Sequence, residues 1–192
     1  MGLLLIEQAF NGLQFGVMLF LIAAGLTLVF GIMDLVNLSH GSLVMVGAYL
    51  ATTLIEWTGS FILGILLALP STFLVGVVVE IVVLRTLYER DHLDQVLATF
   101  GLILFFNELI RIVWGPASLY SGLPESISGH VEILPGVPYP AFRLLIILVG
   151  LLVALLIYFI VARTKLGMLI RAGASNREMA GALGVNILSL IH

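Results

Sequence analysis

The chain consists of long apolar runs separated by short polar connections. A helix needs about 20 mostly apolar residues to cross a bilayer, and five runs reach or approach that length: 8–30, 41–57, 61–84, 95–114 and 141–162. The composition agrees, since 61% of the residues are hydrophobic and only 10% are charged, with a mean hydropathy of +1.21. The pattern predicts an all-α, polytopic integral membrane protein with about five membrane spans.

A polar cluster interrupts this pattern between the first two runs. The segment 31–47 holds, between apolar stretches, Asp34, Asn37, Ser39, His40 and Gly41. An unpaired polar group in hydrocarbon is costly, so these residues need water, partners or a polar path. Two interpretations stay open. The segment is either a tight turn with a capped helix start, or a break within the bilayer that contributes to a translocation path.

Basic residues indicate how the spans are oriented. They gather in two connections, 85–94 and the stretch that follows the fifth run: Arg85, Arg90, Arg163, Lys165, Arg171 and Arg177. The proline-rich loop 115–140 has no lysine or arginine. By the positive-inside rule the two basic connections are cytoplasmic and this loop lies outside. Counting back through five crossings places the N-terminus outside and the polar cluster at or near the cytoplasmic side.

Several kinds of chemistry find no support in the sequence. It has no cysteine, and its four histidines are not at metal-ligand spacing, so neither a metal nor a cofactor is expected. It contains no G-x-x-x-x-G-K-[ST] phosphate loop, so the chain is not expected to hydrolyse ATP. The basic residues lie at span ends and form no nucleic-acid patch. Glu108 and Arg111 lie three apart in the fourth run, and we predict a structural ion pair between them.

The polar stretch after the fifth run contains a helix-start signal. Ser175 and Glu178 match the S-x-x-E capping box, and Gly184 can end the helix that follows, which predicts a two-turn helix over 176–183. Two turns are not stable alone, so its apolar face needs a partner. Two partners stay open: the lipid surface, or a groove on a cytoplasmic protein.

The segments 31–49, 79–115 and 165–186 together resemble a bacterial branched-chain amino acid ABC transporter permease, most closely the first of its two permease subunits. Their most specific parts are Asn-Leu-Ser-His-Gly at 37–41 and the stretch 171–186. The resemblance implies that 176–183 is the coupling helix, which docks on the ATP-binding subunit. Its role is carried by Ser175, Arg177, Glu178, Met179, Ala180, Leu183 and Gly184. It also places the cluster 34–41 near the translocation path.

The resemblance further implies the setting in which the chain works. Residues 1–192 would form the N-terminal part of an importer's permease domain, since family members continue through further membrane helices. The implied function is a non-enzymatic permease subunit for leucine, isoleucine, valine or related small amino acids in the cytoplasmic (inner) membrane. The implied partners are separate ATP-binding cassette subunits, a second permease subunit that is identical or different, an extracytoplasmic substrate-binding protein and the lipid bilayer.

Three other functions stay open on the residues. A permease for urea or short amides resembles this family at the same level. An ion-coupled secondary transporter would also use a broken helix, although it has no need of an ATPase dock. An intramembrane hydrolase would use Ser39 and His40, but adjacent helical residues project about 100° apart and do not by themselves form a nucleophile–base pair.

Overall fold

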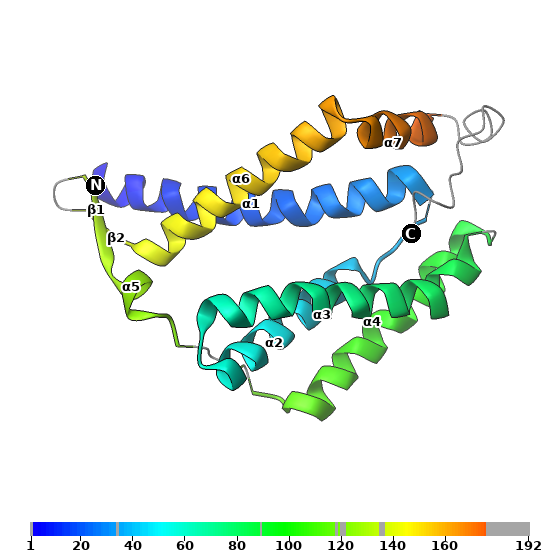
Figure 1. Ribbon diagram of the computed structural model, residues 1–192, viewed down its shortest axis with the longest axis horizontal. Helices are drawn as coiled ribbons and strands as arrows, with labels where there is room; N and C mark the ends of the chain where they lie inside the picture. Colours follow the sequence, from blue (N-terminus) through cyan, green and yellow to red (C-terminus); the bar gives the residue numbers. More distant parts are fainter. Residues whose placement is uncertain are drawn as a thin grey trace. The chain divides into compact units, whose positions relative to one another are not determined.

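The computed structural model describes residues 2–33, 35–88, 90–117, 119, 122–134 and 137–175. Most of these residues are helical (Figure 1). The elements in chain order are α1 (Gly2–Met33), α2 (His40–Thr58), α3 (Phe61–Val82), the 3-10 helix η1 (Leu84–Leu87), α4 (His92–Trp114), α5 (Glu125–Ser128), β1 (His130–Leu134), β2 (Val137–Pro140), α6 (Ala141–Arg163) and α7 (Lys165–Ser175).

The helices fall into two compact units. One contains α1, α5, the β1–β2 hairpin, α6 and α7, and the other contains α2, α3, η1 and α4. Within the described residues, four helices are long and apolar enough to cross a membrane: Leu4–Gly31, Phe61–Val82, His92–Trp114 and Ala141–Arg163. The prediction of an all-α polytopic membrane protein is therefore confirmed.

Helix α2 was predicted as a span but is not one of these four. Its 19 residues are long enough, and the shortfall is in hydropathy, because His40, Glu56 and its threonines are polar. Its packing nevertheless matches that of a span. The residues just before α2 are hydrogen-bonded to the first turns of α4, and the indole of Trp114, at the other end of α4, donates to the Thr53 hydroxyl at 2.7 Å. The chain therefore contacts α4 both just before α2 and again near the end of α2.

Close backbone packing joins α2 to α3. The turn between them has Gly59 in the left-handed region, with φ at 63°, where glycine is the least strained residue. Just beyond it, a Cβ on Gly64 would lie 2.6 Å from the Cα of Ile55. Further along, a Cβ on Gly47 would meet the Thr72 hydroxyl at 3.2 Å. Small residues let helices approach closely in lipid, where dispersion contacts and hydrogen bonds drive their association.

In the unit that contains α1, α6 and α7, helices α1 and α6 run in the same direction. Near the start of both helices, the Asn11 side-chain oxygen accepts hydrogen bonds from the Tyr139 hydroxyl at 3.1 Å and the Arg143 guanidinium at 2.6 Å. Near the end of α1, Gly31 lies against Ala174 of α7. The hairpin and the start of α1 therefore share one end of the unit, and α7 lies at the opposite end.

Two parts of this unit differ from the sequence expectation. The loop 115–140 contains the short helix α5 and an antiparallel hairpin in which Val131 pairs with Tyr139. Helix α7 was not predicted, because the stretch after the fifth run was taken as polar connection up to the capping box. The structure starts this helix at a different cap, where the Thr164 hydroxyl accepts from the Gly167 N–H at 3.1 Å.

The corner between α6 and α7 is closely packed. A Cβ on Gly167 would overlap the backbone oxygens of Ile160 and Val161, so glycine is required there on steric grounds. The Arg171 guanidinium donates to the carbonyl oxygen of Val161 in the last turn of α6. A cation is favourable at this end of a helix, where carbonyl groups lack intrahelical partners. The corner therefore holds α7 in a fixed direction relative to α6.

Adding a methyl group at Gly64 is expected to destabilise the protein. Gly64→Ala forces the α2 and α3 backbones apart, and such overpacking costs about 1–3 kcal/mol. Gly76→Ala is the matched control on the same helix, because no described atom lies within 4 Å of a Cβ at that position. The comparison is the midpoint of unfolding of the full-length protein in detergent. Equal midpoints for the two variants would contradict the packing described here.

Candidate functional site

The described part of the polar cluster before α2 contains two buried polar residues. We call residues 35–39 the break. Asn37 and Ser39 are 4% and 0% exposed, and the Asn37 side-chain oxygen accepts from the Ser39 backbone N–H at 3.0 Å and from its hydroxyl at 2.7 Å. The Ser39 carbonyl in turn accepts from the N–H groups of Ser42 and Leu43 and so begins α2. Asn37 and Ser39 therefore build the start of this helix.

Two buried side chains of α4 form hydrogen bonds with the backbone of the break. Gln95 is 2% exposed and Thr99 is 0% exposed. The Gln95 amide oxygen accepts from the Val36 N–H at 3.1 Å. The Thr99 hydroxyl lies 2.8 Å from the Gln95 carbonyl oxygen and 3.4 Å from that of Val36. The backbone groups of Val36, which are not part of a helix, thus find partners on α4.

The same Gln95 side chain reaches the connection between α3 and α4, residues 84–91. Its amide nitrogen donates to the carbonyl oxygens of Leu87 and Arg90, each at 3.2 Å. Leaving a buried polar group unsatisfied costs about 1–3 kcal/mol, so a fully partnered amide in this position stabilises the local geometry. The break, the connection and the first turns of α4 are joined at this point.

The five candidate residues of the cluster have different surroundings. Asn37 and Ser39 are buried and bonded to each other, and the N-cap residue Ser39 forms no side-chain capping hydrogen bond to the first turn of α2. His40 is half-buried and Gly41 is exposed, and Asp34 lies outside the described residues. The Ser39 hydroxyl donates to Asn37 and not to His40, so this geometry does not activate Ser39 as a nucleophile. The role of the cluster in a translocation path stays a prediction.

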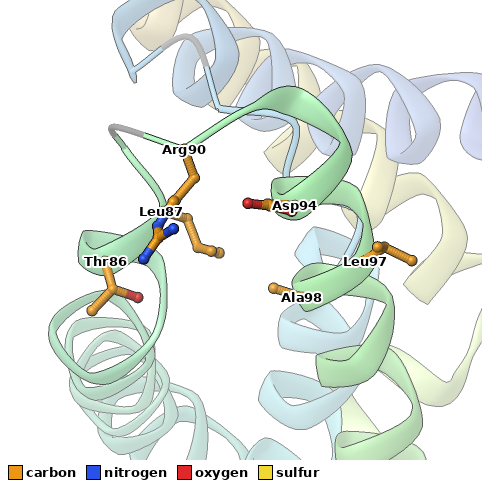
Figure 2. A pocket seen from close by; sticks show the side chains of 6 residues that line it. All are labelled: Thr86, Leu87, Arg90, Asp94, Leu97 and Ala98. Atoms are coloured by element: carbon orange, nitrogen blue, oxygen red, sulfur yellow. The ribbon is translucent and has the colours of Figure 1, made fainter.

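An open pocket of about 490 Å³ lies beside the connection. Figure 2 shows Thr86, Leu87 and Arg90 of the connection on one wall and α4 residues on the other, with the Asp94 carboxylate directed toward the space between them. Leu87 is buried, whereas Arg90 and Asp94 are exposed. The remaining lining residues are Leu97 and Ala98.

An ion pair between two charged residues of α4 was predicted. Glu108 and Arg111 are both exposed, and no ion pair joins them in the part of the chain that the structure describes, so their pairing stays a prediction. Nearer the connection, the carboxylate of Glu80 accepts a hydrogen bond from the Tyr88 hydroxyl at 3.0 Å. Within the described ranges, no three histidine, aspartate or glutamate side chains form a group that could hold a metal ion.

The predicted coupling helix cannot be placed. Ser175 is the last residue of α7, and the remaining residues assigned to the coupling role lie outside the described residues: Arg177, Glu178, Met179, Ala180, Leu183 and Gly184.

The sequence analysis also missed Gln95 and Thr99. A signal for them was available, because two polar residues four apart on one face of an otherwise apolar helix need partners within the bundle.

Comparisons with known proteins agree with this membrane architecture. The model of a family described as "Branched-chain amino acid transport system / permease component" matches residues 8–191. The chain is 29% identical to the high-affinity branched-chain amino acid transport system permease protein BraD of Pseudomonas aeruginosa, over 97% of this chain and 64% of that protein. It is 26% identical to the corresponding permease protein LivH of Escherichia coli K12, over 94% of this chain and 62% of that protein.

A permease protein of Methanocaldococcus jannaschii is also similar to this chain. The probable branched-chain amino acid transport permease protein LivH of Methanocaldococcus jannaschii is 28% identical over 88% of this chain and 55% of its own length. The chain thus spans less than two thirds of the length of these relatives. No solved structure matches it. Because the family model covers nearly the whole sequence, the chain belongs to the family of permease components of branched-chain amino acid transport systems.

Proposed function

We propose that this chain is part of a permease subunit of an ATP-driven importer that moves branched-chain or related small amino acids across the cytoplasmic membrane. The observation that carries the proposal is the family match over residues 8–191, on a chain whose described helices have membrane length and apolarity. The names of the bacterial and archaeal relatives support leucine, isoleucine and valine over urea or short amides as substrates.

The energy source is proposed to be a separate ATP-binding cassette subunit. The sequence contains no phosphate-binding loop of the Walker type. The predicted coupling helix, 176–183, would follow α7 directly. Helix α7 contacts both α1 and α6, and Thr164 and Arg171 fix its direction at the corner. A displacement of the coupling helix would therefore be passed to two membrane helices, as a change between outward- and inward-facing states requires.

The proposed orientation agrees with contacts inside each unit. Asn11 joins α1 to Tyr139 of the hairpin and Arg143 of α6, so the start of α1 and the hairpin share a side. Gln95 joins the break to the connection 84–91, so these two segments also share a side. Both pairings are those expected from the positive-inside rule, with the hairpin extracytoplasmic and the connection cytoplasmic.

A proposed import cycle also needs partners beyond the ATPase. A second permease subunit would complete the pore, and a substrate-binding protein would deliver the amino acid to the extracytoplasmic side. The ion-coupled alternative has no specific observation in its favour, and uptake that persists after ATP depletion but collapses with the ion gradient would support it.

Cysteine labelling tests the orientation directly, because the chain has no cysteine of its own. Ala117→Cys and Asp91→Cys, both at exposed positions, are expected to react from opposite sides of intact cells with a membrane-impermeant maleimide. Position 117 should react in intact cells, and position 91 only after permeabilisation. Labelling of both positions from the same side would refute the proposed topology.

The coupling role is tested by a charge placed on the apolar face of the predicted helix. Ala180→Glu would bury an unpaired carboxylate in the proposed ATPase groove, and it should abolish co-purification of the ATP-binding subunit while the permease still inserts. Gly181→Glu is the matched control, since helical spacing places it on the face opposite Met179, Ala180 and Leu183. Retention of the ATPase by both variants would show that the segment is not the dock.

The polar cluster is tested by separating stability from transport. Asn37→Ala removes the acceptor of two hydrogen bonds at the start of α2, and it should lower the free energy of unfolding by about 1 kcal/mol. His40→Ala leaves the two Asn37–Ser39 hydrogen bonds in place, and it should reduce amino acid uptake several-fold at unchanged membrane abundance if the cluster borders the path. Normal uptake by His40→Ala would leave the cluster with a purely structural role.

A further inference from the structure

The side chain of Gln95 is saturated with hydrogen bonds to separate parts of the chain. Its oxygen accepts from Val36 N–H at 3.1 Å and lies 3.3 Å from the His92 Nδ1. Its nitrogen donates to the carbonyls of Leu87 and Arg90. A neutral amide offers two donor and two acceptor positions, so every position is used when the His92 Nδ1 carries a proton. These contacts bring together residues 59 positions apart in the sequence.

The planarity of the amide makes these contacts interdependent. Oxygen and nitrogen belong to one rigid group, so a shift of the connection relative to the break would break hydrogen bonds on one side or carry the amide with it. The group is 2% exposed, and water cannot readily replace a lost partner at such a depth. Separate movement of the two segments is therefore penalised, and joint movement is favoured.

One side of the connection borders an open pocket. The open pocket of about 490 Å³ is lined by Leu87 and Arg90, the two residues whose carbonyls accept from Gln95 (Figure 2). A change in the filling of this pocket, or a force on the exposed Arg90, would act on the connection first. The Gln95 amide that bonds to these carbonyls also bonds to the Val36 N–H, so such a displacement would reach Val36 through Gln95.

We propose that Gln95 is a positioning residue that passes displacements of the connection 84–91 to the break 35–39. This inference rests on the proposed ATP-driven function, because nucleotide binding on the cytoplasmic side would supply the displacement. It assigns Gln95 no contact with the substrate. Its effect would be to set the position of α2, whose first turn begins at the break.

Hydrogen exchange in the complete transporter, reconstituted with its ATP-binding subunits in lipid nanodiscs, tests the proposal. Exchange is measured in segments 35–42 and 84–91 with and without ATP plus vanadate. In the wild type, both segments should change on nucleotide addition. In Gln95→Leu, 84–91 should still respond, whereas the response of 35–42 should fall at least two-fold. Uptake should fall several-fold while ATP hydrolysis continues. A merely structural role would instead reduce both exchange responses together with membrane abundance.

Two further variants keep the test decisive. Gln95→Glu keeps an acceptor for the Val36 N–H but loses the donors to Leu87 and Arg90, so it should give the same separation of responses even if Gln95→Leu fails to fold. Gln8→Leu makes the same chemical change at an exposed glutamine of α1, whose side chain forms no hydrogen bond with the part of the chain that the structure describes, and it should match the wild type.

The outcomes separate this inference from the function on which it rests. If segment 35–42 responds to nucleotide as strongly in both Gln95 variants as in the wild type, the positioning role of Gln95 is overturned and ATP-driven coupling stands. If nucleotide changes neither segment in the wild type, the proposed coupling fails and the role of Gln95 fails with it.

Discussion

The structure of the second unit depends on the satisfaction of backbone groups where the chain leaves helical geometry between α1 and α2. Each peptide there carries a donor and an acceptor that a helix would have paired. Away from water, such groups must find other partners. Val36 obtains them from Gln95 and Thr99 of α4, and Asn37 and Ser39 bond to each other. The position of α4 relative to α2 follows from these contacts, and Trp114 and Thr53 maintain it at the far end.

The first unit uses a similar arrangement at both ends of α1. Polar side chains of the hairpin and of α6 converge on Asn11 at one end. At the other end, the α6–α7 corner is fixed by Arg171 and by the absence of a side chain at Gly167. In each unit, apolar length and composition set which helices can cross a membrane, and a few polar contacts near the helix ends set how they are paired.

The sequence predicted the membrane helices well because apolar length is a local property. The starts of α3 and α6 and the end of α4 coincide with the predicted boundaries at residues 61, 141 and 114. Helix α7 was missed because an amphipathic, partly basic sequence is also typical of a polar loop between spans. Its packing against α1 and α6, which identifies it as a helix of the bundle, depends on the tertiary structure. A turn at Asn37 and Ser39 could be expected from residue type, but Gln95 could not be matched to Val36, because that contact depends on tertiary structure.

The modest hydropathy of α2 has a consequence for how the protein is made. A segment that contains His40, Glu56 and several threonines partitions weakly into lipid by itself, whereas α3, with a hydropathy of 2.5, partitions strongly. Only Gly59 and Ser60 separate the two helices, and their backbones are in close contact at Gly64. Helix α2 is therefore expected to enter the bilayer as one arm of a helical hairpin, so that its biogenesis depends on the synthesis of α3.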